Sequence, residues 1–135
     1  MENKPRIVDE LIQGDENVRS NFGIEVISAK DGSCEVTMVV SEQWVNGAGF
    51  THGSVAYALM DSACAYACGS LEVLGLTTNG NVTYVRATKA GAQIRGRAKV
   101  VSQSRRVISF STELVDEQDN LLAHGSFVFQ AVEKR

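Results

Sequence analysis

The stretch that most constrains the fold runs from Gly53 to about Leu71, where small and apolar residues follow one another with a single charge, Asp61. It contains no proline and many alanines, which favours one long α-helix. A helix that is apolar on nearly every face is buried on several sides, and small side chains let neighbouring elements approach closely. The sequence therefore predicts a fold built around one central helix.

Strands are expected in the sequence both before and after this helix. Asp31-Gly32 is a turn signal that divides FGIEVISAKDGSCEVTMVVS into a hairpin. Four further strands are expected in TTNGNVTYVRA, AQIRGRAKVVS, RRVISFSTELVD and NLLAHGSFVFQAVE, with turns at 89–91, 102–104 and 116–119. A short amphipathic helix is expected in PRIVDELIQG. About six antiparallel strands and one long helix pack most economically as a sheet curled around that helix, an α+β fold, with residues 1–135 as a single domain.

Charge and composition exclude several classes of function. A net charge of −3 gives no electrostatic basis for binding nucleic acid or an anionic membrane surface. Asp61 interrupts the only apolar run that approaches the length of a membrane span. The N-terminal segment has charges where a signal peptide has its apolar core, and the three cysteines do not form a disulfide framework. We therefore expect a cytoplasmic protein that binds neither nucleic acid nor membrane.

Asp61 and the segment before its helix carry the chemistry. A buried carboxylate is costly unless it is hydrogen-bonded or used. One interpretation is structural, with Asp61 accepting hydrogen bonds from buried groups. The other is catalytic, because NGAGFTHGS leads into the helix with Asn46 in a tight turn and Gly53 at the helix N-terminus, where free N–H groups suit an oxyanion. These are the parts that acyl transfer needs.

The segment NGAGFTHGSVAYALMDSACAYACGS resembles the signature of hotdog-fold acyl-CoA thioesterases of the phenylacetate-pathway (PaaI) type, in which an Asn and a His-Gly-Gly precede an acid nine residues after the His. The resemblance extends over nearly the whole chain, including NVTYVR. It implies that the Gly53 N–H polarises the thioester carbonyl and that Asp61 is the general base or nucleophile. Asn46 and His52 would shape the site, and a hydroxyl found in some relatives falls on Thr77 or Thr78. The second Gly of the motif is Ser54 here, a change expected to affect fit more than chemistry.

Gly53 and Asp61 are too far apart to serve one carbonyl carbon together. Eight residues of helix separate them by roughly 12 Å. Either one of them is not catalytic, or the site combines residues of two subunits. The resemblance implies the second arrangement, with two composite sites in a two-fold dimer, and a homodimer or a homotetramer is expected.

Coenzyme A carries phosphates, so cations are expected at the mouth of the site. The candidates for substrate binding are Arg86, Lys89, Arg105 and Arg106 for the nucleotide, and Phe50, Tyr57 and Trp44 for the acyl group. The basic residues are equally compatible with a solvated face, since Arg95, Arg97 and Lys99 alternate on one strand and can pair with Glu113 across a hairpin. Each aromatic residue is equally compatible with a place in the core.

The remaining histidine and cysteine residues suggest no other chemistry. His52 and Asp61 are too far apart on one helix for a Ser54–His52–Asp61 triad, so His52 is expected to be a hydrogen-bonding residue at the helix entrance. His124 is expected to be structural or exposed. Cys64 and Cys68 are expected in the core, with no metal and no cofactor other than the coenzyme A of the substrate.

These observations favour an acyl-CoA thioesterase acting on an aryl-acetyl or medium-chain acyl group. Two alternatives remain: a non-catalytic acyl-CoA-binding module such as a ligand sensor, and a hydratase. Asp61 disfavours the sensor, because a binder has little use for a carboxylate beside a thioester. The layout of Gly53 and Asp61 suits hydrolysis better than water addition to a double bond.

Overall fold

In a computed structural model of the protein, residues 6–132 are described. Two short helices come first, α1 (Ile7–Gly14) and α2 (Glu16–Phe22), and the central helix α3 (Gly53–Gly69) interrupts the strands. The strands are β1 (Glu25–Lys30), β2 (Ser33–Val39), β3 (Gly75–Tyr84), β4 (Gln93–Gln103), β5 (Val107–Val115) and β6 (Leu121–Ala131), with a 3-10 turn at Glu42–Trp44. The six strands and the long helix confirm the α+β prediction.

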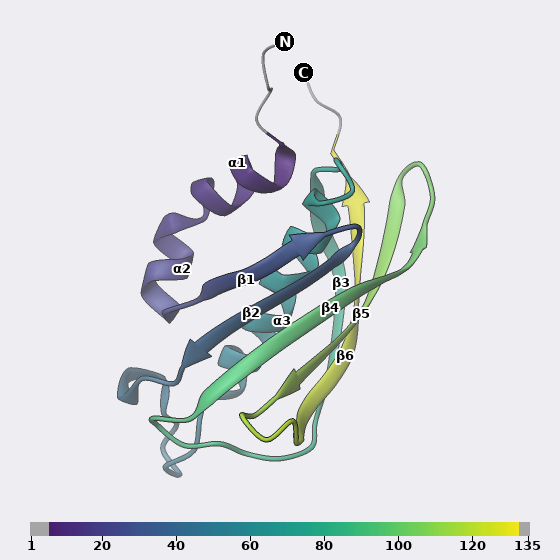
Figure 1. The fold of residues 1–135 in the computed structure, drawn as a ribbon. Helices are drawn as coiled ribbons and strands as arrows, with labels where there is room; N and C mark the ends of the chain where they lie inside the picture. The colour runs from purple at the N-terminus through teal and green to yellow at the C-terminus, as the bar shows by residue number, and fades with distance from the viewer. Residues whose placement is uncertain (1–5, 133–135) are drawn as a thin grey trace.

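One antiparallel sheet in the order β1-β2-β4-β5-β6-β3 curls around α3 (Figure 1). The helix packs against strands from the whole width of the sheet, from β1 to β3. In Figure 1 it begins at the lower end of the molecule and ends near the top, while the β4–β5 hairpin extends at the upper right. The curl follows from the small side chains of α3, which allow the sheet to close around it.

The first hairpin forms as the sequence predicts. Asp31 and Gly32 have φ values of 53° and 79°, the left-handed pair of a two-residue turn that matches the twist of the flanking strands. An added Cβ at Gly32 would meet Val100 and Leu71. The turn therefore needs glycine both for its backbone conformation and for this close approach.

The core lies between α3 and the concave face of the sheet. Leu59, Met60 and Cys64 of the helix are fully buried, and Phe110 and Phe127 meet them from the sheet. Alternate residues along β2 and β4 face this core: Cys34, Val36 and Met38 are buried on β2, and Ile94, Gly96 and Ala98 on β4.

Three details of the elements differ from the sequence predictions. The central helix ends at Gly69 rather than Leu71, and β4 continues to Gln103, so the predicted turn at 102–104 begins later, at Ser104. Helix α2 was not predicted at all. Its sequence ENVRSNF buries no residue, so it lacks the apolar periodicity by which a helix is detected.

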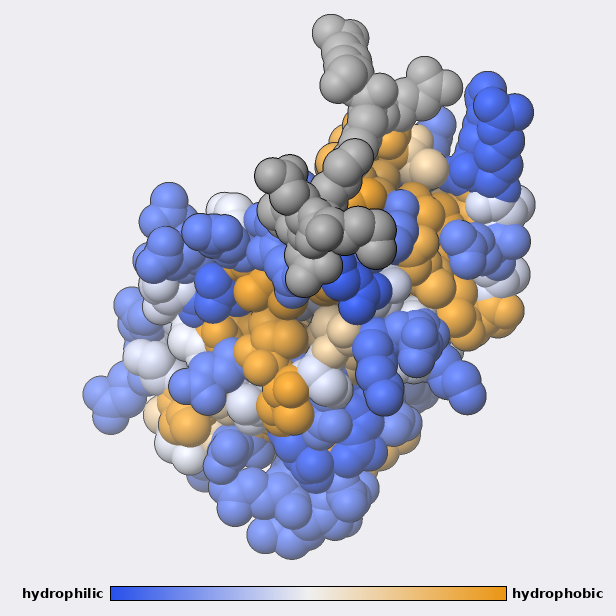
Figure 2. All heavy atoms as spheres, turned by 45° about the horizontal axis from the view of Figure 1, so that its top comes forward, coloured by the Kyte–Doolittle hydropathy of each residue, from blue (hydrophilic) through white to orange (hydrophobic). Residues whose placement is uncertain are grey.

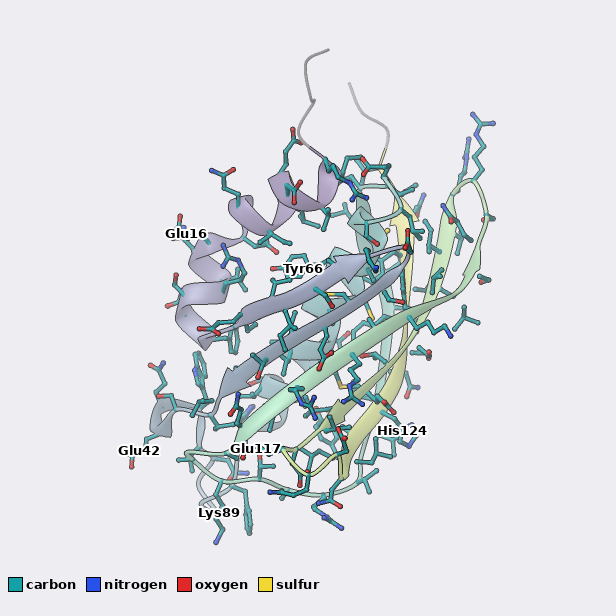
Figure 3. All side chains as sticks on the ribbon, viewed as in Figure 1. Glu16, Glu42, Tyr66, Lys89, Glu117 and His124 are labelled. Atoms are coloured by element: carbon teal, nitrogen blue, oxygen red, sulfur yellow. The ribbon has the colours of Figure 1, made fainter. Side chains whose placement is uncertain are left out.

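The N-terminal helices are fastened to the far end of α3. The Cβ that Gly69 lacks would lie 3.1 Å from Val8 Cα, so the absence of a side chain permits close packing of α1. The Tyr66 hydroxyl donates a 2.9 Å hydrogen bond to Asp15 from a fully buried ring, which Figure 3 shows between α3 and these helices. Further along, Phe22 stacks on Trp44 with ring centroids 4.6 Å apart.

Strand β3 leaves one edge of the sheet open. Strand β3 forms one edge and is exposed over most of its length, with Leu76 and Tyr84 more than half exposed. Figure 2 shows hydrophobic residues among hydrophilic ones over the end of the molecule that faces upward in Figure 1. A long open edge is a ready surface for pairing with another strand.

No helix within residues 6–132 is long and apolar enough to cross a membrane.

Candidate active site

His52 caps the N-terminus of α3. Its φ and ψ of −62° and 141° are extended, and its ring Nδ1 accepts a 3.0 Å hydrogen bond from the Ser54 N–H. The Ser54 hydroxyl lies 2.7 Å from the same nitrogen. Because the backbone N–H can only donate, Nδ1 is an acceptor and the neutral ring carries its proton on Nε2. The predicted place of His52 as a hydrogen-bonding residue at the helix entrance is confirmed.

Asn46 holds the turn that leads into this helix. Its Oδ1 accepts hydrogen bonds from the N–H groups of Ala48 (2.9 Å) and Phe50 (3.1 Å), so the amide side chain closes the loop on itself. Phe50 is exposed and lies under Lys89, whose Nζ is 5.5 Å from the ring centroid. Figure 3 places Lys89 at the lower end of the molecule, where α3 begins.

Asp61 lies half-buried in the middle of α3, where Thr77 at the start of β3 donates a 2.7 Å hydrogen bond to its Oδ1. Burial raises the pKa of Asp61, and the Thr77 hydrogen bond lowers it in part. Thr78 points elsewhere and donates to the Val128 carbonyl. The geometry thus selects Thr77, of the two threonines considered, as the hydroxyl beside the carboxylate.

Tyr84 is a residue of this region that sequence reasoning missed. Its hydroxyl donates a 2.6 Å hydrogen bond to the Gly53 carbonyl, and it sits at the end of β3 beside the start of α3. Burial raises the pKa of Tyr84, with a smaller contribution from Tyr57, so the hydroxyl stays protonated as a donor. The only sequence signal was its place in NVTYVR, two residues before the predicted Arg86.

Gly53 and Asp61 stand on one uninterrupted helix, so the structure keeps them apart. The eight-residue separation corresponds to roughly 12 Å along the axis. Each has its own contact on β3: Gly53 with Tyr84 at one end of the strand, and Asp61 with Thr77 near the other. The candidate oxyanion donor and the candidate acid therefore lie at two separate places in this chain. We call them the oxyanion half-site (His52, Gly53) and the acid half-site (Asp61, Thr77).

The predicted substrate-binding residues do not gather at one place. Arg86 lines a cavity beside Gly53. Arg105 and Arg106 lie in the β4–β5 hairpin, at the opposite end of α3 in Figure 1. Tyr57 leans over Gly80 of β3 and packs edge-on against Phe127, 5.0 Å between centroids. Trp44 packs against the core and the α2 end rather than this cavity.

Two of the basic residues that alternate along β4, Arg95 and Arg97, belong to an ion-pair network on the outer face of the sheet. Arg97 pairs with Glu113 at 3.7 Å, as the sequence predicts. Arg95 and Arg97 also share Asp119, at 2.6 and 2.8 Å, and both approach Glu35. The pairing with Asp119 and Glu35 could not be read from the sequence, because these residues come from other strands and turns. These arginines therefore have structural partners.

The other residues considered for chemistry are placed as expected. His124 is exposed on β6 (Figure 3), and Cys64 and Cys68 are fully buried in the core. Burial raises the pKa of the Cys68 thiol to about 11, so it stays protonated at neutral pH. Within residues 6–132 no group of three or more His, Cys, Asp or Glu side chains is arranged to hold a metal ion.

Comparison with known proteins identifies the family to which this geometry belongs. The sequence pattern of the thioesterase superfamily matches residues 48–123, which begin two residues after Asn46 and end in β6. The chain belongs to the thioesterase superfamily. This membership confirms the hotdog-fold thioesterase family that the sequence resembles, and with it a hydrolase that acts on thioesters.

Individual relatives support the same assignment. Acyl-coenzyme A thioesterase PaaI of Escherichia coli is 32% identical over 102 residues, covering 76% of this chain and 73% of that protein. Human acyl-coenzyme A thioesterase 13 is 30% identical over 105 residues, covering 76% and 75%. The solved structure of the E. coli PaaI protein from the phenylacetic acid degradation operon superposes with a TM-score of 0.87 at 26% identity, over 92% of this chain and 90% of that one. The hotdog fold of this thioesterase superfamily member is thereby confirmed.

Proposed function

We propose that this protein hydrolyses acyl-CoA thioesters with Asp61 as general base or nucleophile and the N–H of Gly53 of the partner subunit as oxyanion donor. The acyl group proposed is an aryl-acetyl group, such as phenylacetyl, or a medium-length chain. The observation that carries the proposal is the 2.7 Å hydrogen bond from Thr77 to Asp61, which orients a half-buried carboxylate on the central helix of a thioesterase. The acyl-CoA substrate itself is supported by the names of the E. coli and human relatives.

The open edge of the sheet supports a site shared by two subunits. Suppose that two β3 strands pair in an antiparallel manner around Gly80 and Asn81. Thr77 of one subunit then lies opposite the partner's Tyr84. Because Thr77 contacts Asp61 and Tyr84 contacts Gly53, this register brings the two half-sites together. It also covers the exposed edge of β3. A homodimer is therefore the proposed unit, and two such dimers form the proposed tetramer.

The reaction follows from these groups. Water attacks the carbonyl carbon while the Asp61 carboxylate accepts its proton, or the carboxylate attacks directly and water then cleaves the anhydride. The developing oxyanion accepts a hydrogen bond from the Gly53 N–H. This N–H lies in the first turn of α3, where no carbonyl of the same helix can accept its hydrogen bond. The C–S bond breaks, and the coenzyme A thiolate takes up the proton. Both routes need an ionised Asp61.

The antiparallel pairing also suggests where coenzyme A lies. It would bring the partner's Arg86 and the partner's Lys89 towards the end of this subunit that carries Arg105 and Arg106. The four cations proposed for the nucleotide, which are divided between two ends of one chain, would then border one site. Phosphate binding by such a mixed set needs no further cofactor.

The proposal is tested by coenzyme A thiol release from a panel of acyl-CoAs. Wild-type protein should release thiol, and Asp61→Asn should lower kcat by about 10²- to 10⁴-fold. Asp119→Asn is the matched control, because it makes the same acid-to-amide change on the outer face of the sheet, in the arginine network. It should retain wild-type kcat.

Two outcomes would contradict the proposal. A folded Asp61→Asn protein with near wild-type turnover would remove Asp61 from the mechanism. A wild-type protein that binds acyl-CoA but releases no thiol from any member of the panel would favour the alternative function, a non-catalytic acyl-CoA-binding module.

A further inference from the structure

A cavity of about 200 Å³ opens beside Gly53, at the end of the sheet where α3 begins. Its rim is formed by exposed residues that include His52, Gly53, Tyr84 and Arg86. Two of these, His52 and Gly53, belong to the candidate oxyanion half-site. The cavity is therefore continuous with the place where the thioester carbonyl would bind.

The floor of the cavity is apolar and buried. It is made of five side chains, each at most 7% exposed, drawn from α3, β4, β5 and β6: Ala56, Ile94, Leu114, Leu122 and Ala123. Ala56 lies one helical turn beyond the cap, and Ala123 is opposite Tyr84 in the β3–β6 ladder. Two alanines on facing elements leave the space open, because any larger side chain at either position would grow into it.

We infer that this cavity is the acyl pocket of the enzyme and that Ala56 and Ala123 set the size of the acyl group it accepts. The inference rests on the proposed function. An apolar cavity of about 150 Å³ binds benzene, so the observed space suits an aryl ring or a short alkyl chain. It is too small for a long fatty acyl chain. The acyl group would enter past Gly53, with the carbonyl at the helix N-terminus and the coenzyme A outside near Arg86.

This assignment differs from the sequence-based candidates for the acyl pocket. Phe50, Tyr57 and Trp44 were considered because large aromatic residues often line such sites, yet none of them lines this cavity. The five residues of its floor are small or aliphatic and come from four separate elements. No local motif marks them, so only the folded chain brings them together.

The test compares kcat/KM for acetyl-, hexanoyl-, phenylacetyl- and palmitoyl-CoA. Wild-type enzyme should prefer phenylacetyl- or hexanoyl-CoA over palmitoyl-CoA. Ala56→Leu should lower the ratio of phenylacetyl-CoA to acetyl-CoA by about 10-fold or more, since one methylene in an apolar pocket changes discrimination by about 10- to 200-fold. Ala123→Val should act in the same direction and suits a strand, which guards against misfolding of the first variant. A general structural defect would lower kcat/KM for all substrates together and leave the ratio of phenylacetyl-CoA to acetyl-CoA unchanged.

Ala29→Leu is the matched control, because it enlarges a half-buried alanine on β1, at the other edge of the sheet. Its selectivity should equal that of the wild type. A second measurement needs no variant: with methyl-labelled alanine, the phenylethyl thioether of coenzyme A should give NOEs from its ring to the Ala56 and Ala123 methyl groups, and none to Ala29.

Unchanged selectivity in the folded variants, or NOEs that miss both alanines, would overturn the pocket assignment. The proposed function would survive either result, because wild-type thiol release and its loss in Asp61→Asn are measured separately.

Discussion

At the scale of single residues, the molecule holds one carboxylate under two opposing influences. Burial on α3 raises the pKa of Asp61, and the hydrogen bond from Thr77 lowers it. The ionised form of Asp61 is therefore less favoured than that of a solvent-exposed aspartate. The Thr77 hydroxyl still stabilises it by donating a hydrogen bond. A base with a raised pKa accepts a proton more readily, so the same burial that costs stability serves proton transfer.

The pH dependence of catalysis should reveal this balance. Activity needs ionised Asp61, so the acid limb of kcat/KM should lie above the pKa of an ordinary aspartate, 3.8. Thr77→Val removes the contribution that lowers the pKa, so its limb should move to higher pH. Thr78→Val is the matched control, since that hydroxyl bonds the Val128 carbonyl, and its limb should stay in place. A Thr77→Val limb that stays fixed or moves to lower pH would contradict the assigned contact.

The same burial makes Asp61 a cost to folding. Because its pKa is higher in the folded than in the unfolded protein, the folded state binds more protons between the two values, and stability falls as pH rises through that window. Above it the full cost is present. Asp61→Asn keeps an oxygen that accepts from Thr77 and carries no charge, so it should raise Tm at neutral pH while it lowers kcat. A lower Tm in thermal unfolding would show that the carboxylate is a net stabilising group.

At the scale of elements, local signals in the sequence predicted most of the fold. The run of small and apolar residues predicted the central helix, Asp31-Gly32 predicted the first hairpin, and both are observed. Helix α2 was not predicted because none of its residues is fully buried. It is held by contacts with residues outside it, such as the Arg19 Nε hydrogen bond to the Ile12 carbonyl.

The site divides in the same way. Asp61, Gly53, Asn46 and His52 lie within sixteen consecutive residues (46–61), so one local motif could mark them. Tyr84 and the strand residues of the pocket floor, Ile94, Leu114, Leu122 and Ala123, are brought to the site by strand pairing across the sheet. Such long-range neighbours leave no local signal in a single sequence.

The contact between β3 and β6 depends on one missing side chain. A Cβ at Gly125 would collide with the Asn81 carbonyl oxygen, a backbone atom that cannot step aside without separating the strands. Gly125→Ala should therefore destabilise the protein by about 1–3 kcal/mol, the usual cost of overpacking. Because β3 carries both Thr77 and Tyr84, activity should fall as well.

Gly14→Ala provides the comparison for this variant. No heavy atom outside the chain neighbours lies within 4 Å of the added Cβ, and Gly14 has no left-handed φ. Its unfolding midpoint in urea should match or slightly exceed that of the wild type. Equal midpoints for both variants would mean that β3 tolerates displacement from β6.

At the scale of the whole molecule, a site divided between subunits should allow two inactive proteins to restore each other. Asp61→Asn removes one half-site and Gly53→Pro removes the oxyanion N–H of the other. Proline is accepted at the first helical position, and the extended His52 backbone, φ −62° and ψ 141°, is the conformation that proline favours in the residue before it. The Tyr84 hydroxyl, 3.2 Å from the added Cβ, must shift by a few tenths of an ångström.

Random exchange of subunits gives about half mixed dimers, each with one intact site, so about a quarter of wild-type sites should return. Loss of an oxyanion donor costs about 10²- to 10³-fold in kcat, which leaves a parental background low enough for this recovery to be measured. Light scattering and a tag-exchange assay should show that mixing has occurred. Activity that then remains parental would mean that each subunit carries a complete site of its own.

The stack of Phe22 on Trp44 has an optical consequence. Trp44 is the only tryptophan of the chain, so all indole emission comes from this one position. Its ring stacks on Phe22 of α2, with 4.6 Å between the two ring centroids. Its backbone carbonyl accepts a 2.7 Å hydrogen bond from the N–H of His52, the residue that caps α3. The emission of this indole therefore reports on the junction between the N-terminal helices and the loop that carries the oxyanion half-site, and it does so without any label.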